Sequence, residues 1–158
     1  MISDQSATTV LSVLIAQLVA SAGMVGVIWF VQLITYPQFA ILDEDTFVDY
    51  HAEYSKRVTW IVAPLMLIEI ASAFLVVFQL WKSPFFGLAA LSLLVVLTLW
   101  TLTAFVQVPQ HSRLSYGYSK ETIEAFVRGN WVRTVLWTLK VVLSSILLYR
   151  FVTNQSGV

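Results

Sequence analysis

Four long apolar stretches alternate with shorter polar segments along the chain, and this pattern is the strongest structural signal in the sequence. A helix of about 20 apolar residues is long enough to cross the roughly 30 Å hydrocarbon core of a bilayer. We therefore predict an all-α, polytopic membrane protein whose four-helix bundle is formed by transmembrane spans at residues 10–34, 58–80, 85–108 and 131–151.

The polar segments before the second and fourth spans also carry a helical pattern. Phe47, Tyr50 and Tyr54 recur at helical spacing, and so do Ile123 and Phe126. This spacing is typical of amphipathic helices that lie at a membrane surface. We predict two short interfacial helices on one side of the membrane, at residues 46–57 and 119–129.

Three residues mark the expected ends of these elements. Proline lacks a backbone N–H and disfavours helical geometry in the residue before it, so Pro37 is expected to end the first span. Gly129 is expected to end the second interfacial helix, and Asn130 to cap the fourth span. The chain, residues 1–158, is expected to form one transmembrane domain, and no internal sequence repeat is evident.

The division of positive charge predicts an orientation. With four spans, both termini and the short loop at residues 81–84 share one side of the membrane, and the two longer loops lie on the other. Six Lys and Arg residues lie on the side of the longer loops and two on the opposite side. The positive-inside rule then makes the longer loops cytoplasmic, and a cell inner membrane is the expected location.

Composition narrows the classes of protein further. The chain is 58% hydrophobic and 11% charged, against about 25% charged in an average soluble protein. Nine basic and nine acidic residues give no basic surface for nucleic acid, so the bilayer is the expected partner. The absence of cysteine excludes disulfides, thiolate metal sites and cysteine nucleophiles.

Two ionisable residues fall inside the predicted spans. Glu69 lies eleven residues after Val58 and Lys140 nine residues after Trp131, which places them about 16 Å and about 14 Å deep. A charge at the centre of a membrane helix costs about 2.5–3.5 kcal/mol on insertion scales. Because the two charges have opposite signs and similar depths, we predict a buried ion pair between Glu69 and Lys140, with a functional role such as proton transfer as the alternative.

Polar side chains from four separate segments are expected to meet at the membrane face that carries the longer loops. Helix bundles build ligand and cofactor sites from such facing side chains, although the same groups would also hydrogen-bond helix ends and lipid headgroups. The candidate catalytic residues are His111, Asn130 and Arg133, and the candidate cofactor-binding residues are Tyr36, His51, Arg57 and Gln107.

The residue types in this candidate site limit its chemistry. Only two histidines are present, so a metal centre held by several histidines is not expected. The two histidines could ligate one haem axially, with an arginine on its propionates. Alternatively, Arg133, Asn130 and a histidine could bind an anionic or quinone-type ligand, with the histidine as proton carrier.

A resemblance to a known family rests on small and aromatic residues in the first and fourth spans. The residues that carry it are Gly23, Gly26, Phe30 and Pro37, then Asn130, Trp131, Arg133 and Trp137. In these positions and in its four-span plan, the chain resembles the small four-helix membrane proteins of the anthrone-oxygenase-like family, most of which are uncharacterised. The resemblance implies oxidation of fused-ring anthrones to quinones without a tightly bound cofactor, and makes His111, Asn130 and Arg133 the residues to carry over.

The sequence thus leaves several functions open. The first is a membrane protein that binds an apolar ring or quinone-type compound and acts on it as an oxidoreductase. The alternatives are a non-catalytic accessory subunit or assembly factor of a larger membrane complex, and a small haem-binding membrane protein. A transporter ranks last, because no pair of broken helices in corresponding positions is evident.

Overall fold

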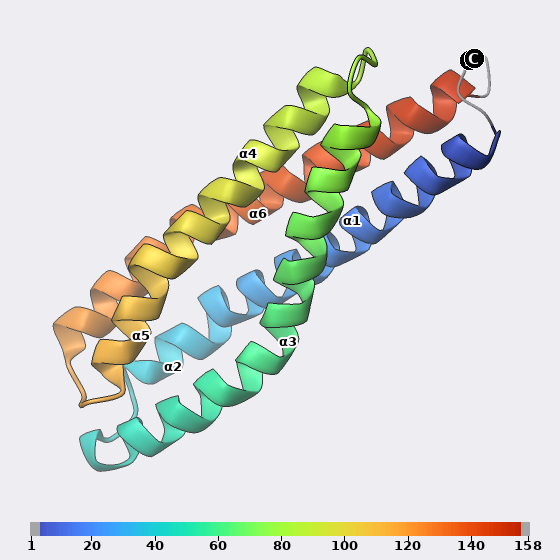
Figure 1. Cartoon of the computed structure of the whole chain (residues 1–158). Coiled ribbons are helices and arrows are strands. Elements are labelled where there is room, and N and C mark those ends of the chain that lie inside the picture. Colours follow the sequence, from blue (N-terminus) through green and yellow to red (C-terminus); the bar gives the residue numbers. More distant parts are fainter. Residues whose placement is uncertain (1–3, 156–158) are drawn as a thin grey trace.

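The computed structural model describes residues 4–155, which fold into four long helical segments with no strand in that range (Figure 1). The first segment joins α1 (Asp4–Phe30), the π-helical turn η1 (Val31–Thr35) and α2 (Tyr36–Phe39), and the second is α3 (Glu44–Gln79). The third joins α4 (Phe86–Leu102), the π-helical turn η2 (Thr103–Gln107) and α5 (Val108–Leu114), and the fourth is α6 (Lys120–Gln155). The predicted all-α four-helix fold is confirmed.

All four segments are long and apolar enough to cross a membrane. The outer surface of the bundle is also apolar, since Trp60, Phe78 and Phe105 are each about 80% exposed. Large apolar side chains on the outside of a bundle suit a lipid environment rather than water. The chain is a multi-pass membrane protein.

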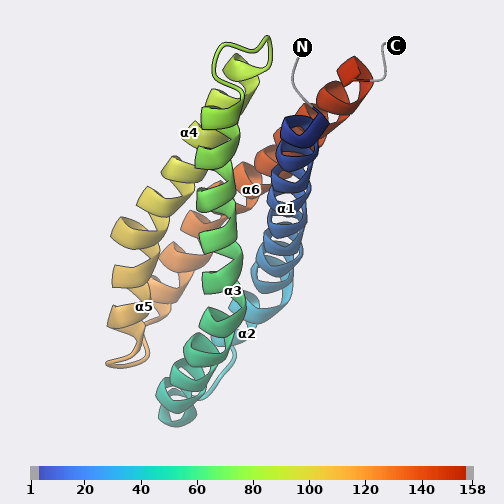
Figure 2. The ribbon, with the colours of Figure 1, turned by 45° about the vertical axis from the view of Figure 1, so that its right-hand side comes forward.

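The helices run alternately up and down, and the loops divide between the two ends of the bundle (Figures 1 and 2). The segment α1 packs against α3 and α6, and α4 packs against the same two helices. Both ends of the described chain lie near the loop at residues 80–85. The loops at residues 40–43 and 115–119 lie at the opposite end, which we call the site end.

The two predicted interfacial helices are helical, but they are not separate elements. Residues 46–57 form the first turns of α3 and residues 120–129 the first turns of α6, so Gly129 does not end a helix and Asn130 does not cap one. The reason is that their apolar residues continue the inward face of the following span. Phe47 and Phe126 are fully buried in the bundle instead of lying in the headgroup layer.

The expectation that Pro37 ends the first span is also wrong. The helix passes through Pro37 and continues to Phe39 because η1 widens the turn before it, and the N–H of Tyr36 donates to the carbonyl of Val31. A π turn holds one extra residue and lets the backbone pair again around a proline, which has no N–H. The turn at η2 does the same before Pro109.

These two π turns reveal a structural repeat that the sequence does not make evident. Each five-residue π turn is followed two residues later by Pro-Gln, at Pro37-Gln38 and at Pro109-Gln110. Each is then followed by a loop and by a helix of 36 residues, α3 or α6. The bundle therefore consists of two helical hairpins of the same plan, both starting from the end where the termini lie.

Candidate functional site

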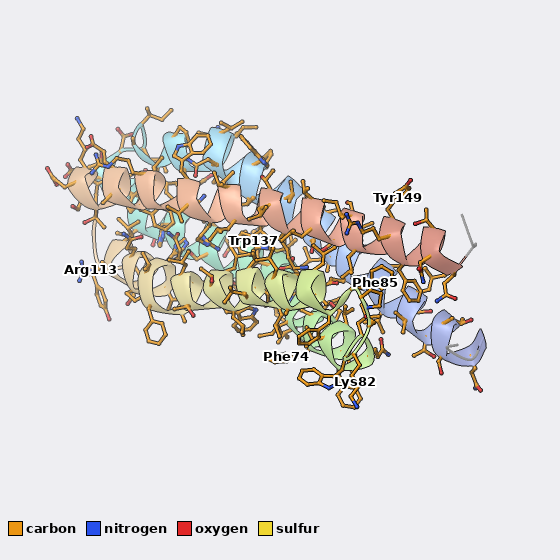
Figure 3. The ribbon with its side chains drawn as sticks, turned by 90° about the horizontal axis from the view of Figure 1, so that it is seen from above. Phe74, Lys82, Phe85, Arg113, Trp137 and Tyr149 are labelled. Carbon is orange, nitrogen blue, oxygen red and sulfur yellow. The ribbon has the colours of Figure 1, made fainter. Side chains whose placement is uncertain are left out.

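One face of α6 carries a row of buried side chains with polar atoms. Asn130, Arg133, Trp137, Lys140 and Ser144 follow one another at intervals of three or four residues, which places them on one helix face. All five side chains are buried. Figure 3 shows Trp137 in the interior of the bundle, between α6 and α4.

At the site end of this face, a hydrogen-bond network joins α6 to η1. Arg133 Nη1 donates to Asn130 Oδ1 over 2.9 Å, and Asn130 Nδ2 donates to Gln32 Oε1 over 2.7 Å. Gln32 Nε2 then donates to the carbonyl of Val127 over 3.3 Å. Asn130 is thereby held by partners on both sides, and it fixes the position of the Arg133 guanidinium.

Next to this network lie the two histidines of the chain, in direct contact. His51 Nε2 of α3 and His111 Nδ1 of α5 are 3.0 Å apart. Phe47 stacks on His51 with ring centroids 5.6 Å apart, and Phe126 meets the edge of His111 at 4.6 Å. A hydrogen bond at this distance needs a proton on one nitrogen and a lone pair on the other, so at least one of these two rings is neutral.

A cavity of about 140 Å³ opens between these groups. Its wall includes Tyr36, Tyr54, Gln107, His111 and Arg133, which come from α2, α3, η2, α5 and α6. Because residues of α1 and η1 line it as well, seven elements converge on one small space, and both π turns contribute to its wall. We call this space the inner cavity.

Several polar atoms at this site have no partner. Arg133 Nε, His51 Nδ1 and Gln107 Oε1 are buried without a hydrogen bond. No carboxylate pairs with Arg133 in the described residues, where the ion pairs are Glu53–Arg57 and Glu124–Arg128. A buried charge without a counter-charge is costly, and a buried polar atom without a hydrogen bond calls for a partner such as water or a ligand.

An open groove of about 700 Å³ lies beside the inner cavity, between α1 and η1 on one side and α3 on the other. Its wall is mainly apolar and includes Gly26, Phe30 and Ile61. The aromatic ring of Phe30 and the side chain of Ile61 are more than half exposed on the lipid-facing surface. The groove, which we call the outer groove, therefore opens sideways from the bundle.

Deeper in the bundle, Glu69 and Lys140 lie near one another without a direct ion pair. Ser21 joins them: its hydroxyl donates to Glu69 Oε1 over 2.7 Å and accepts from Lys140 Nζ over 3.4 Å. Lys140 Nζ also donates to Ser144 Oγ over 2.8 Å. The predicted ion pair is therefore replaced by a contact through Ser21 of α1. We call Ser21, Glu69, Lys140 and Ser144 the charge layer.

Trp137 lies between the charge layer and the site end. The Arg133 guanidinium lies over its ring, 4.9 Å from the centroid, and the indole Nε1 donates to Glu69 Oε2 over 2.9 Å. The fully buried ring thus contacts both the site end, through Arg133, and the charge layer, through Glu69.

Most of the site residues selected from the sequence are brought together, and Arg57 is not. His51, His111, Asn130 and Arg133 adjoin one another or line the inner cavity, and so do Tyr36 and Gln107. Arg57 instead lies exposed at the rim of the outer groove and donates to Glu53 over 2.6 Å. Arg113, at the same membrane face, points away from the bundle (Figure 3).

Tyr54 is a site residue that the sequence reasoning missed. It lines both the inner cavity and the outer groove. Its position three residues after His51 places it near the same face of the helix, and this spacing was the available signal.

The geometry does not fit a haem held by both histidines. An iron between them would lie about 2 Å from each nitrogen, as zinc does from imidazole, so the two nitrogens would be about 4 Å apart on opposite sides of the metal. The histidine rings instead bond directly to each other at 3.0 Å. Within residues 4–155, no group of three or more His, Cys, Asp or Glu side chains is placed to hold a metal ion.

Comparisons of the chain with protein-family models, curated proteins and solved structures found no match.

Proposed function

We propose that this protein binds a quinone-type or phenolic ring compound in the inner cavity and acts on it as an oxidoreductase-like membrane protein. The observation that supports this most is the buried Arg133 guanidinium, which faces the cavity with Nε unpaired and no carboxylate partner. A ring oxygen with negative charge, or a carbonyl oxygen, is the acceptor that such a donor lacks.

The other wall residues suit the same type of ligand. Oxidation of a ring diol to its quinone releases two protons and two electrons. The His51–His111 pair can accept a proton at the open lone pair of its neutral ring. The electrons require an acceptor from outside the chain, such as dioxygen, which would leave as hydrogen peroxide. The resemblance to the anthrone-oxygenase-like family supports the same type of reaction, the oxidation of a ring compound to a quinone.

A matched pair of arginine variants tests this proposal. The purified protein in detergent is extracted for mass spectrometry of bound ring compounds, and it is titrated with a benzoquinone while tryptophan fluorescence is followed. Arg133→Gln is expected to weaken binding at least tenfold, because it removes the charged donor. Arg128→Gln, on the outer face of the same helix, is expected to bind like the parent protein because Arg128 is exposed.

The result that contradicts the proposal is equally specific. If the parent protein carries no ring compound and binds none, or if both arginine variants bind equally, the inner cavity is not a ring site. A protein that instead purifies stably with other membrane subunits would favour the accessory role.

We also propose that the site end faces the cytoplasm, in a cell inner membrane. The uneven division of Lys and Arg between the two sides supports this orientation. Because the chain has no cysteine, single cysteines can report each side without further changes. A cysteine at Gly117 is expected to resist a membrane-impermeant maleimide in intact cells, whereas one at Ser83 is expected to react. The reverse labelling would overturn the orientation.

A further inference from the structure

The size of the inner cavity limits which ring compounds can occupy it. The cavity measures about 140 Å³. A protein cavity of about 150 Å³ holds a single benzene ring. A fused three-ring anthrone, the substrate class that the family resemblance implies, therefore exceeds this space. The inner cavity accommodates one ring beside Arg133 and His111.

The surroundings of the cavity indicate where the rest of a larger ligand would lie. The inner cavity and the outer groove share part of their wall, because Val27, Val31, Tyr54 and Val58 line both. The outer groove is five times larger, mainly apolar, and open towards lipid. The groove is therefore the apolar space that adjoins the cavity, across these four side chains, and a hydrocarbon chain attached to the ring would lie there.

We propose that the ligand is a single-ring quinone or phenol with a long apolar tail, whose ring occupies the inner cavity and whose tail lies in the outer groove. This inference rests on the proposed function, since it names the substrate class of the same site. Such a lipid-soluble ligand enters sideways from the bilayer, between α1 and α3, and does not need to pass through either loop end.

Glycine positions provide a way to fill the groove without disturbing the fold. A Cβ added at Gly26, in the groove wall, meets no atom within 4 Å. The same holds at Gly87, which lies in the first turn of α4 and does not line the groove. Gly26→Leu therefore places a side chain in the outer groove, and Gly87→Leu is a control of the same chemistry.

The test compares three probes on three proteins: a decyl-tailed benzoquinone, the same ring without its tail, and anthrone. The parent protein and Gly87→Leu are expected to bind the tailed ring at least tenfold more tightly than the tailless ring, and to show no saturable binding of anthrone. Gly26→Leu is expected to bind the tailed ring no more tightly than the tailless ring, and to bind the tailless ring with the affinity of the parent protein. Partition of the tail into detergent is the same for all three proteins, so it cannot produce this difference.

The possible failures can be told apart. If anthrone binds as tightly as the tailed ring, or if Gly26→Leu and the parent protein show the same tail dependence, the single-ring inference is wrong while the ring site stands. If none of the three probes binds the parent protein, the proposed function itself fails, and this inference fails with it.

Discussion

Arg133 combines features that rarely occur together, since it is charged, buried and without a carboxylate partner. Its stabilising contacts include one hydrogen bond to Asn130, the face of Trp137 and an electrostatic interaction with the Tyr36 hydroxyl. A cation over an indole ring is worth about 2 kcal/mol when desolvated, which is less than the several kcal/mol that burial of an ion costs. A buried arginine without a carboxylate partner is the feature that the proposed ligand would explain.

This imbalance predicts that Arg133→Met leaves the free energy of unfolding unchanged or raises it by about 1 kcal/mol, because the desolvation cost disappears with the charge. Unfolding is measured by titration with a denaturing detergent. Arg128→Met, which removes an exposed arginine, is the control and is expected to change stability by less than about 0.5 kcal/mol. A loss of more than about 2 kcal/mol in Arg133→Met would show that Arg133 is a structural residue.

For Ser21 we predict the opposite effect on stability, a loss when its side chain is removed. It accepts from Lys140 and donates to Glu69, so its removal leaves a buried carboxylate and ammonium each with one bond fewer. Ser21→Ala is expected to lower the free energy of unfolding by about 1–3 kcal/mol. Ser145→Ala removes an exposed hydroxyl bonded to its own helix and is expected to have little effect. Equal effects in the two variants would mean that the charge layer does not depend on the serine.

At the scale of the element, the π turns determine which side chains face the cavity. The extra residue in η1 rotates the helix that follows it, and this rotation brings Tyr36 and Phe39 into the core, where both are buried. In η2 the same device places Gln107 in the core and His111 against His51. π turns occur often at functional sites, where a regular helix would point the wrong residues inward.

Deletion of Leu33 within η1 tests this role. Removing one residue restores the α-helical period and turns Tyr36 and Phe39 by about 100° away from their present positions. Since two buried aromatic rings lose their packing, the free energy of unfolding is expected to fall by more than about 2 kcal/mol. Leu33→Ala retains the π turn and changes a side chain that is more than half exposed, so a loss below about 1 kcal/mol is expected. Similar losses in both variants would contradict the role assigned to the π turn.

At the scale of the whole molecule, the two similar hairpins each supply half of the site. The first hairpin contributes Tyr36, His51 and Tyr54, and the second contributes His111 and Arg133. The charge layer is divided in the same way, since Glu69 and Lys140 come from different hairpins. Neither hairpin alone can form the cavity, so the site depends on their association within the membrane.

This division predicts that the chain can be split in the loop between α3 and α4. Co-expressed fragments 1–82 and 83–158 are expected to co-purify through a tag on one of them, because preformed transmembrane helices associate by packing and interhelical hydrogen bonds. Glu69→Leu in the first fragment is expected to reduce recovery, since Lys140 then lies buried without its counter-charge. Independent purification of the two fragments would show that the covalent loop is essential.

The features that could be predicted from the sequence are those that depend on residues close together in the chain, and not on packing between helices. The four spans follow from local composition and were predicted. The π turns were not, because they depend on packing around Pro37 and Pro109, and a proline in an isolated sequence indicates only that a helix ends. The depth of Glu69 and Lys140 follows from counting residues, whereas the serine between them belongs to a third helix.

The candidate site shows the same limit. His111, Asn130 and Arg133 stood out as polar residues where apolar spans end. Arg57 was chosen for the same reason and lies outside the site, because six residues after His51 correspond to about 120° around the helix. Tyr54 lies only about 60° from His51 by the same geometry. The different directions of Arg57 and Tyr54 follow once residues 44–79 are known to form one continuous helix. The sequence pattern instead predicted two separate helices in this range.

The position of Trp137 also limits the routes by which a proton could cross the bundle. Polar residues occur along most of the length of α6, which would offer a leak for hydrogen ions if they formed one continuous chain. The indole is a donor only, so it cannot receive a proton from one neighbour and pass it to the next. Under the proposed function, a proton released at the histidine pair would therefore not pass through Trp137 to the charge layer. If the protein acts as we propose, turnover would then not dissipate the electrochemical gradient across the bilayer through this indole.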